Sequence, residues 1–150
     1  MSKSVVIAVD AMGGDNSPRK VIAGISEYLK SNNNVFFRIF GNKTIVTNEL
    51  SKNSISNNFF EIIHCEDIVK NNDTPLSAAK KKNTSMFLAI NDVKERNSNV
   101  VISAGNTGAL FVISKLNMKM IENISKPALA ALWPNKIDMN IVLDLGANVE

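Results

Sequence analysis

Apolar residues along the chain follow two patterns, short continuous runs and longer stretches with helical spacing. The short runs predict β-strands, because β-branched and aromatic side chains pack well in a pleated layer. They are Ser4–Val9, Val35–Phe40, Phe59–His64, Val100–Ile102, Pro127–Pro134 and Asn140–Leu145. Val100–Ile102 is entirely β-branched, and such side chains pack well in a pleated layer with helices above and below, so we expect this strand to be buried on both faces.

Helical spacing follows most of the strands. Apolar stripes predict helices after Pro18 (Val21, Ile22, Ile25, Leu29), over Thr44–Leu50, from Thr84 or Ser85 to Arg96, and along Ala109, Ile113, Leu116 and Met120, with a short helix or extended arm at Leu76–Lys82. Ser17 is a typical N-cap, and Pro18 after it is a typical first helical residue. The alternation predicts one α/β domain over residues 1–150, with a three-layer, mostly parallel, Rossmann-like sheet.

The turn after the Val100–Ile102 strand consists of small residues. In Ser103–Gly108, Gly105 and Gly108 permit close backbone approach, and Asn106 or Thr107 can cap the next helix. A helix that begins at the carboxyl end of a parallel strand directs N–H groups and a positive dipole end into the crevice above the sheet. The turn is therefore either an anion site, with phosphate as the obvious ligand, or an ordinary strand-to-helix corner. It matches neither a P-loop nor G-x-G-x-x-G.

Two other predicted strands are also followed by loops of glycine and polar residues. The first runs into Asp10-Ala11-Met12-Gly13-Gly14-Asp15, and the last into Asp144-Leu145-Gly146-Ala147-Asn148. Asp10 and Asp15 are open to three roles, as metal ligands, as acid or base, or as acceptors for N–H groups of their own turn. Because the carboxyl ends of parallel strands build binding crevices, we expect the three loops to meet at one end of the sheet.

Composition and charge narrow the class of protein. The chain is 45% hydrophobic and 21% charged, which is ordinary for a soluble globular protein and excludes disordered and fibrous classes. A net charge of +3 is mild, and the excess of lysine and asparagine is typical of AT-rich coding, so nucleic acid is not an expected partner. The N-terminal apolar run is too brief for a secretory signal or a membrane span, and we expect a cytoplasmic protein.

Two groups of reactive side chains have simpler structural interpretations. His64 and Cys65 are strand neighbours that point to opposite faces, so we predict structural roles for them and not a base and a nucleophile. Lys80–Lys82 is either a solvated face or the source of a cation for phosphate or an acidic partner.

The three loop motifs, in this order and at this spacing, resemble the phosphate acyltransferase family of bacterial phospholipid synthesis. The resemblance runs from Val5 to Asn148 and includes the stretch IIHCEDI and the lysine-rich segment before Ser85-Met86. Lysines stand around Lys80–Lys82 and at Lys126, where the family often has the arginine that a bidentate phosphate contact needs. Members of the family are more than twice as long, so the resemblance implies that residues 1–150 are the N-terminal portion of a longer enzyme.

The resemblance implies an acyltransferase that moves a long-chain fatty acyl group from acyl carrier protein to inorganic phosphate, forming acyl phosphate for phospholipid synthesis. It implies a fold similar to the isocitrate and isopropylmalate dehydrogenase and phosphotransacetylase group, a homodimer, and neither a cofactor nor a metal. It also implies peripheral association with the inner face of the membrane, which leaves room for contact with the membrane glycerol-3-phosphate acyltransferase.

Transferred to this chain, the resemblance and the loop chemistry predict catalytic roles for Asn106, Asp10 and Asp144. The predicted substrate-binding residues are Gly13, Gly14, Asp15, Lys82, Ser85, Ser103, Gly105, Thr107, Gly108 and Asn148. No protein nucleophile is required, because a phosphate oxygen attacks the thioester carbonyl and expels the pantetheine thiolate. Catalysis is then mostly positioning and charge stabilisation.

Two alternative functions come from other classes. A nicotinamide-dependent dehydrogenase of the same fold group needs an adenosine-binding segment and clustered acidic metal ligands, and neither is evident. A non-catalytic phosphometabolite-binding domain fits the turn chemistry equally well. For the acyltransferase, no segment carries apolar surface beyond what the sheet and its helices bury, so we expect the acyl groove to need the missing half or a second subunit.

Overall fold

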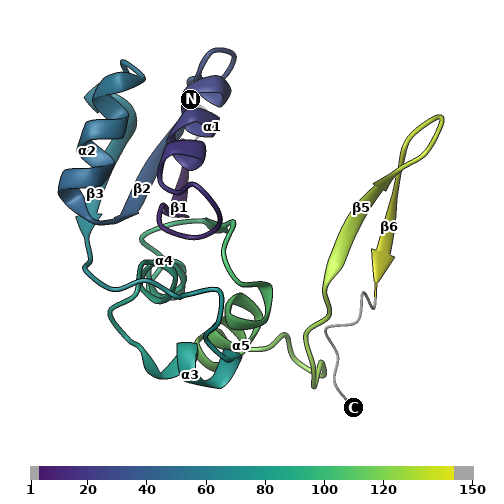
Figure 1. Ribbon diagram of the computed structural model, residues 1–150. Coiled ribbons are helices and arrows are strands. Elements are labelled where there is room, and N and C mark those ends of the chain that lie inside the picture. Colours follow the sequence, from purple (N-terminus) through teal and green to yellow (C-terminus); the bar gives the residue numbers. More distant parts are fainter. Residues whose placement is uncertain (1–3, 144–150) are drawn as a thin grey trace. The chain divides into compact units, whose positions relative to one another are not determined.

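The computed structural model describes residues 4–143, and its contacts divide the chain into two compact units, Met1–Met118 and Lys119–Glu150. The single domain expected over residues 1–150 stays a prediction. The first unit contains a four-stranded parallel sheet in the order β3-β2-β1-β4 (Figure 1). Its strands are β1 (Val5–Asp10), β2 (Val35–Gly41), β3 (Phe60–His64) and β4 (Val100–Ser103). The predicted α/β class and parallel sheet are confirmed.

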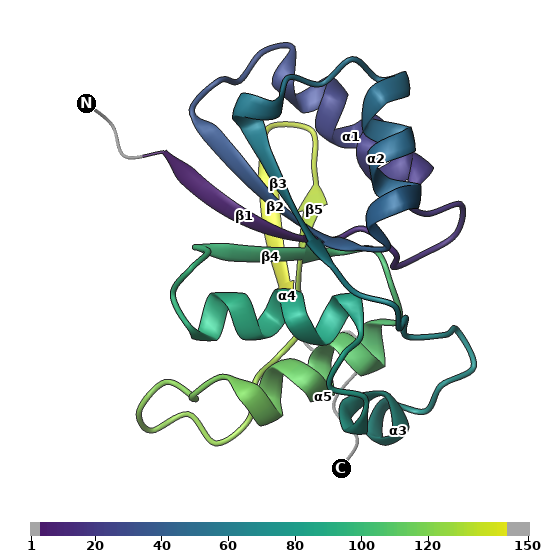
Figure 2. The same ribbon diagram turned by 90° about the vertical axis from the view of Figure 1, so that its left-hand side faces the viewer.

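Helices cover both faces of this sheet (Figure 2). α1 (Arg19–Leu29) and α2 (Lys43–Lys52) lie on one face, and α4 (Ser85–Lys94) lies on the other, in contact with β1, β2 and β4. α3 (Pro75–Lys80) and α5 (Thr107–Asn117) pack against each other, and α5 also packs on α4; a short 3-10 helix, η1 (Asn57–Phe59), precedes β3. Apolar side chains fill both layers, with Ile22 of α1 and Ile90 of α4 fully buried.

Side-chain caps start four of the α-helices. Asn42, Thr74, Thr84 and Asn106 each accept a hydrogen bond from the backbone N–H three residues later, at the starts of α2, α3, α4 and α5. The predicted N-cap at Ser17 is wrong. Pro18 occupies the cap position of α1 without a side-chain hydrogen bond, because the Ser17 hydroxyl instead donates to the carbonyl of Gly13 within the preceding loop.

The prediction that β4 is buried on both faces is also wrong. Val100 and Ile102 are 43% and 52% exposed, whereas Val101 packs against the α4 layer. The reason is position, since β4 is an edge strand and the core under α1 is built from residues of β1 and β2. One face of β4 is therefore uncovered in the first unit.

The second unit contains an antiparallel hairpin of β5 (Ala130–Pro134) and β6 (Met139–Leu143). The strands predicted in both segments are confirmed, and they pair with each other in antiparallel fashion. The connection is too short for a parallel crossover, and the Asn135 side chain closes it by accepting from the N–H groups of Ile137 and Asp138.

An ion pair ties β2 to α4 and generates a stability prediction. Arg38 Nε donates to Asp92 Oδ2 at 2.9 Å, and Asp92 is only 5% exposed. Arg38→Met should lower the free energy of unfolding by about 3 kcal/mol in urea denaturation, because it leaves a buried carboxylate without its cation. Glu61→Gln removes the exposed partner of the same arginine and should cost less than about 1 kcal/mol. Equal losses in the two variants would contradict this assignment.

Candidate functional site

The loops after β1 and β4 are joined by a buried carboxylate. Asp10 pairs in register with Ser103 across the two strands and is 1% exposed. Its Oδ2 accepts from the Ser103 hydroxyl at 2.7 Å, and its Oδ1 accepts from the Met12 N–H at 3.3 Å. Ser103 Oγ in turn accepts from the N–H of Gly105 at 3.1 Å. Three roles were open to Asp10 from sequence, and this geometry fits the role of hydrogen-bond acceptor. The carboxylate holds its own turn through the Met12 N–H and the turn after β4 through Ser103.

Glycine is required where these loops touch. A Cβ built on Gly13 would lie 2.5 Å from Asp10 Oδ2 and 2.9 Å from the backbone nitrogen of Gly105, and one on Gly14 would lie 2.5 Å from the carbonyl oxygen of Ala104. Gly14 also has a φ of 86°, which L side chains rarely adopt. The two loops therefore approach backbone to backbone.

The turn Ser103–Gly108 leads into α5 through Asn106. The Asn106 Oδ1 accepts from the N–H of Ala109 at 2.9 Å, and its Nδ2 donates to the carbonyls of Asn71 and Asp73, each at 3.4 Å. Its amide group is thus committed to capping the helix and holding the 71–73 segment. The first-turn N–H groups of Thr107 and Gly108 have no acceptor within the helix, as at any helix start.

These groups surround an open cavity of about 460 Å³, which we call the glycine-loop cavity. It is lined by Gly14, Asp15, Asn71, Ala104, Gly105, Asn106, Thr107 and Gly108. Five of the eight were predicted from sequence as substrate-binding residues and Asn106 as catalytic, so six of the thirteen predicted site residues line this cavity. Asn71 and Ala104 were missed. Asn71 sits in an irregular polar turn with no periodic signal, and only its donation to Asp15 Oδ1 at 3.4 Å places it here.

The charges at this cavity differ from the expectation. Among its lining residues, Asp15 is charged and none is a lysine or arginine. Lys81 instead pairs with Asp73 at 2.7 Å, and the Lys82 ammonium lies 4.5 Å from the centre of the Phe87 ring. A cation from the Lys80–Lys82 segment is therefore not among the lining groups, and attraction for an anion rests on backbone N–H groups and the start of α5.

Ser85 lies outside the lining of this cavity, and Gly108 has a packing contact in addition to its place in the lining. Ser85 is in the first turn of α4, 1% exposed, with its N–H donating to the carbonyl of Asp67. Gly108 lines the cavity but also faces α3, since a Cβ there would lie 2.9 Å from Pro75 Cγ. Asp144 and Asn148 lie outside the described residues.

His64 and Cys65 lie at the end of β3, away from the glycine-loop cavity. His64 Nδ1 accepts from the Lys43 N–H, and its Nε2 lies 2.8 Å from Glu66 Oε1. Burial of the Cys65 thiol, helped by the negative charges of Asp10, Asp67 and Glu66, raises its pKa to about 12. Because a thiolate is the reactive form, this geometry agrees with the structural roles predicted for both residues.

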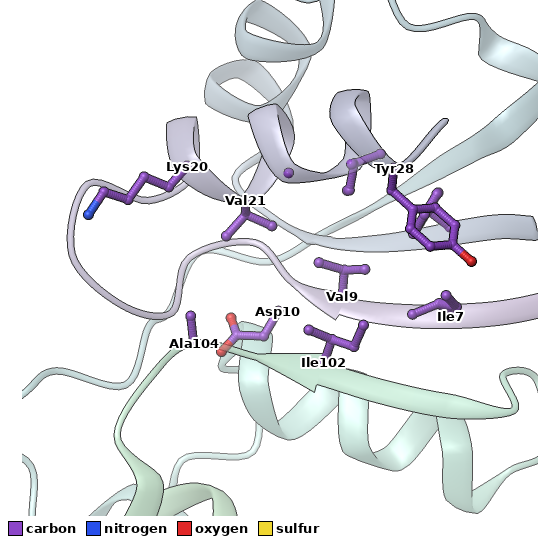
Figure 3. A pocket seen from close by; sticks show the side chains of 11 residues that line it. Ile7, Val9, Asp10, Lys20, Val21, Tyr28, Ile102 and Ala104 are labelled. Atoms are coloured by element: carbon purple, nitrogen blue, oxygen red, sulfur yellow. The ribbon is translucent and has the colours of Figure 1, made fainter. Parts of the chain in front are cut away.

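A second cavity was not predicted. The α1–β4 cavity, of about 410 Å³, lies between α1 and the sheet and is lined by Ile7, Val9, Asp10, Lys20, Val21, Gly24, Ile25, Tyr28, Phe37, Ile102 and Ala104 (Figure 3). The expectation of no spare apolar surface is therefore wrong. The sequence did contain a signal, since Gly24 interrupts a helical pattern where a larger side chain would fill space. No helix within residues 4–143 is long and apolar enough to cross a bilayer.

Comparison with known proteins identifies the family to which the chain belongs. The family model described as fatty acid synthesis protein matches residues 5–150. A phosphate acyltransferase of Pelagibacter ubique is 64% identical over the full length of the chain, and the chain covers 45% of that protein. The corresponding proteins of Neorickettsia sennetsu and Caulobacter vibrioides are 44% and 40% identical, with 45% and 42% of their lengths covered. The chain thus spans less than half the length of these relatives. With the family model matched over nearly all of its residues, the chain belongs to the fatty acid synthesis protein family.

Proposed function

We propose that this chain supplies the phosphate-binding loops of a phosphate acyltransferase that transfers a long-chain fatty acyl group from acyl carrier protein to inorganic phosphate. The observation that carries the proposal is the glycine-loop cavity, where two backbone-to-backbone loops meet the start of α5. Its relatives' name, phosphate acyltransferase, supports the same reaction class.

The reaction balances without a protein nucleophile. A phosphate oxygen attacks the thioester carbonyl, a C–O bond forms, the C–S bond breaks, and the carrier thiolate leaves and takes up a proton. The N–H groups of Thr107 and Gly108 hold the phosphate, and the exposed Asp15 carboxylate accepts a hydrogen bond from a protonated phosphate oxygen. Asp10 acts as a positioning residue, because its carboxylate is buried and already bound to Ser103.

The proposal also includes the fold group, the oligomeric state, the membrane association and the product. The parallel sheet is consistent with a fold of the isocitrate and isopropylmalate dehydrogenase and phosphotransacetylase group. The family resemblance supports three further parts of the proposal. The enzyme is a homodimer, it associates peripherally with the membrane, and its product, acyl phosphate, is the acyl donor for glycerol-3-phosphate acylation. We assign Asp144 and Asn148 to the same site, because they belong to the third loop motif of the family resemblance, Asp144-Leu145-Gly146-Ala147-Asn148.

Asn106 gives the most direct test of the cavity. Asn106→Ala removes the cap and the tie to the 71–73 segment and so displaces the N–H groups of Thr107 and Gly108. It should lower kcat/KM for phosphate by about a hundredfold in acyl phosphate formation from labelled acyl carrier protein by the full-length enzyme. Asn42→Ala is the matched control, since it removes an equivalent cap from α2. Both should cost about 1 kcal/mol of stability, and only the first should change phosphate kinetics. Equal phosphate kinetics in the two variants would reject the site.

Cys65 tests the direct attack by phosphate. With its pKa at about 12, against 9.0 for an ordinary thiol, its thiolate fraction near pH 8 falls about a thousandfold, so iodoacetamide should label the native protein far more slowly than the unfolded chain. Cys65→Ser should leave the rate of acyl transfer within about twofold. An acyl group trapped on Cys65 and detected by mass spectrometry would overturn the mechanism.

A further inference from the structure

The α1–β4 cavity has a polar end and an apolar end. Figure 3 shows Asp10, Lys20 and Ala104 at one end and Ile7 and Tyr28 at the other. The remaining lining residues are apolar or glycine. Its volume lies within the range of pockets that hold small molecules.

The polar end lies next to the proposed phosphate site. Ala104 lines both cavities, and Asp10 is bound to Ser103 at the start of the same turn. From Asp10 back to Ile7 the cavity follows three residues of β1, about 10 Å of extended backbone. An extended ligand that starts at Ala104 therefore has an apolar surface leading away from the phosphate.

The apolar wall is open to solvent in the first unit. Ile102 is 52% exposed and Tyr28 is 48% exposed, and no atom lies within 4 Å of a Cβ built on Gly24. Exposed apolar surface of this kind is unfavourable in water and marks binding sites. Since Asp10 and Lys20 are the charged lining residues and both lie at the Ala104 end, the ligand that fits is a hydrocarbon chain with a polar head.

We propose that the α1–β4 cavity holds the saturated hydrocarbon chain of the acyl substrate, with the reacting carbonyl at Ala104. This inference rests on the proposed function, which requires the carbonyl carbon to lie beside the phosphate and the alkyl chain to lead away from it. The acyl groove is then formed at least in part by this chain, on the uncovered side of the β4 edge strand.

Tyr28 provides a reporter for the test, because its ring lines the apolar end of the cavity. In 3-fluorotyrosine-labelled full-length protein, the ¹⁹F resonance that Tyr28→Phe removes should shift on addition of dodecylphosphonate below its micelle concentration. Inorganic phosphate should leave that resonance unchanged, and butylphosphonate should bind at least tenfold more weakly than dodecylphosphonate. An unmoved Tyr28 resonance with dodecylphosphonate would overturn the inference.

Gly24→Leu fills the cavity from its wall, and it does not threaten folding, because leucine favours a helix interior more than glycine. It should weaken dodecylphosphonate binding at least tenfold and, in the full-length enzyme, shift the preference towards shorter acyl groups with the phosphate KM unchanged. Ala23→Leu is the matched control, an exposed position on the same helix outside the cavity, and it should change neither. An unchanged chain-length preference in Gly24→Leu would show that another segment covers this wall and would overturn the inference.

The two proposals fail in different ways. Binding of inorganic phosphate is followed separately by ³¹P line broadening. A Tyr28 response to dodecylphosphonate in protein that does not bind inorganic phosphate supports the apolar site and contradicts the proposed phosphate site. Phosphate binding and acyl transfer without any effect of Gly24→Leu support the proposed function and contradict the acyl site.

Discussion

The hydrogen bond from the Ser103 hydroxyl to the buried carboxylate of Asp10 holds the candidate site together. A carboxylate that is 1% exposed must have its lone pairs satisfied, and here the partners come from both loops, Ser103 from one and the Met12 N–H from the other. Parallel pairing of β1 with β4 brings the two residues into register. This bond fixes the start of the Ser103–Gly108 turn against the loop after β1.

Close loop contact explains why the site consists largely of backbone. Gly13 and Gly14 face Gly105 and Ala104 at distances that leave no room for a Cβ. Side chains on these two glycines are thereby excluded, and N–H groups at the start of α5 are among the groups presented to a ligand. Backbone N–H groups at a helix start are fixed dipoles that favour an anion, and this supports the proposed reaction, in which phosphate is the nucleophile.

The two cavities differ in the chemistry of their linings, one being polar and the other largely apolar. The glycine-loop cavity has backbone donors and one carboxylate, and the α1–β4 cavity has an apolar wall that begins at Ala104. Within the described residues β4 is the last strand of the sheet, with its carboxyl end beside β1 and one face left uncovered by α1. Ala104, which follows β4, lines both cavities, so the proposed anion site and the hydrophobic surface lie next to each other.

The strand-helix alternation, the parallel sheet and the glycine-rich turns were determined by local sequence, because periodicity, β-branched runs and turn residues act over short ranges. The predicted residues Gly14, Asp15 and Gly105 do line one cavity. Only the tertiary structure showed that Asp10 links the two loops through Ser103 and that the Asn106 amide also holds the 71–73 segment, and only it showed that one face of β4 is open in the first unit. Those outcomes depend on which side chains and layers meet across the fold, and such long-range contacts leave no periodic trace in the chain.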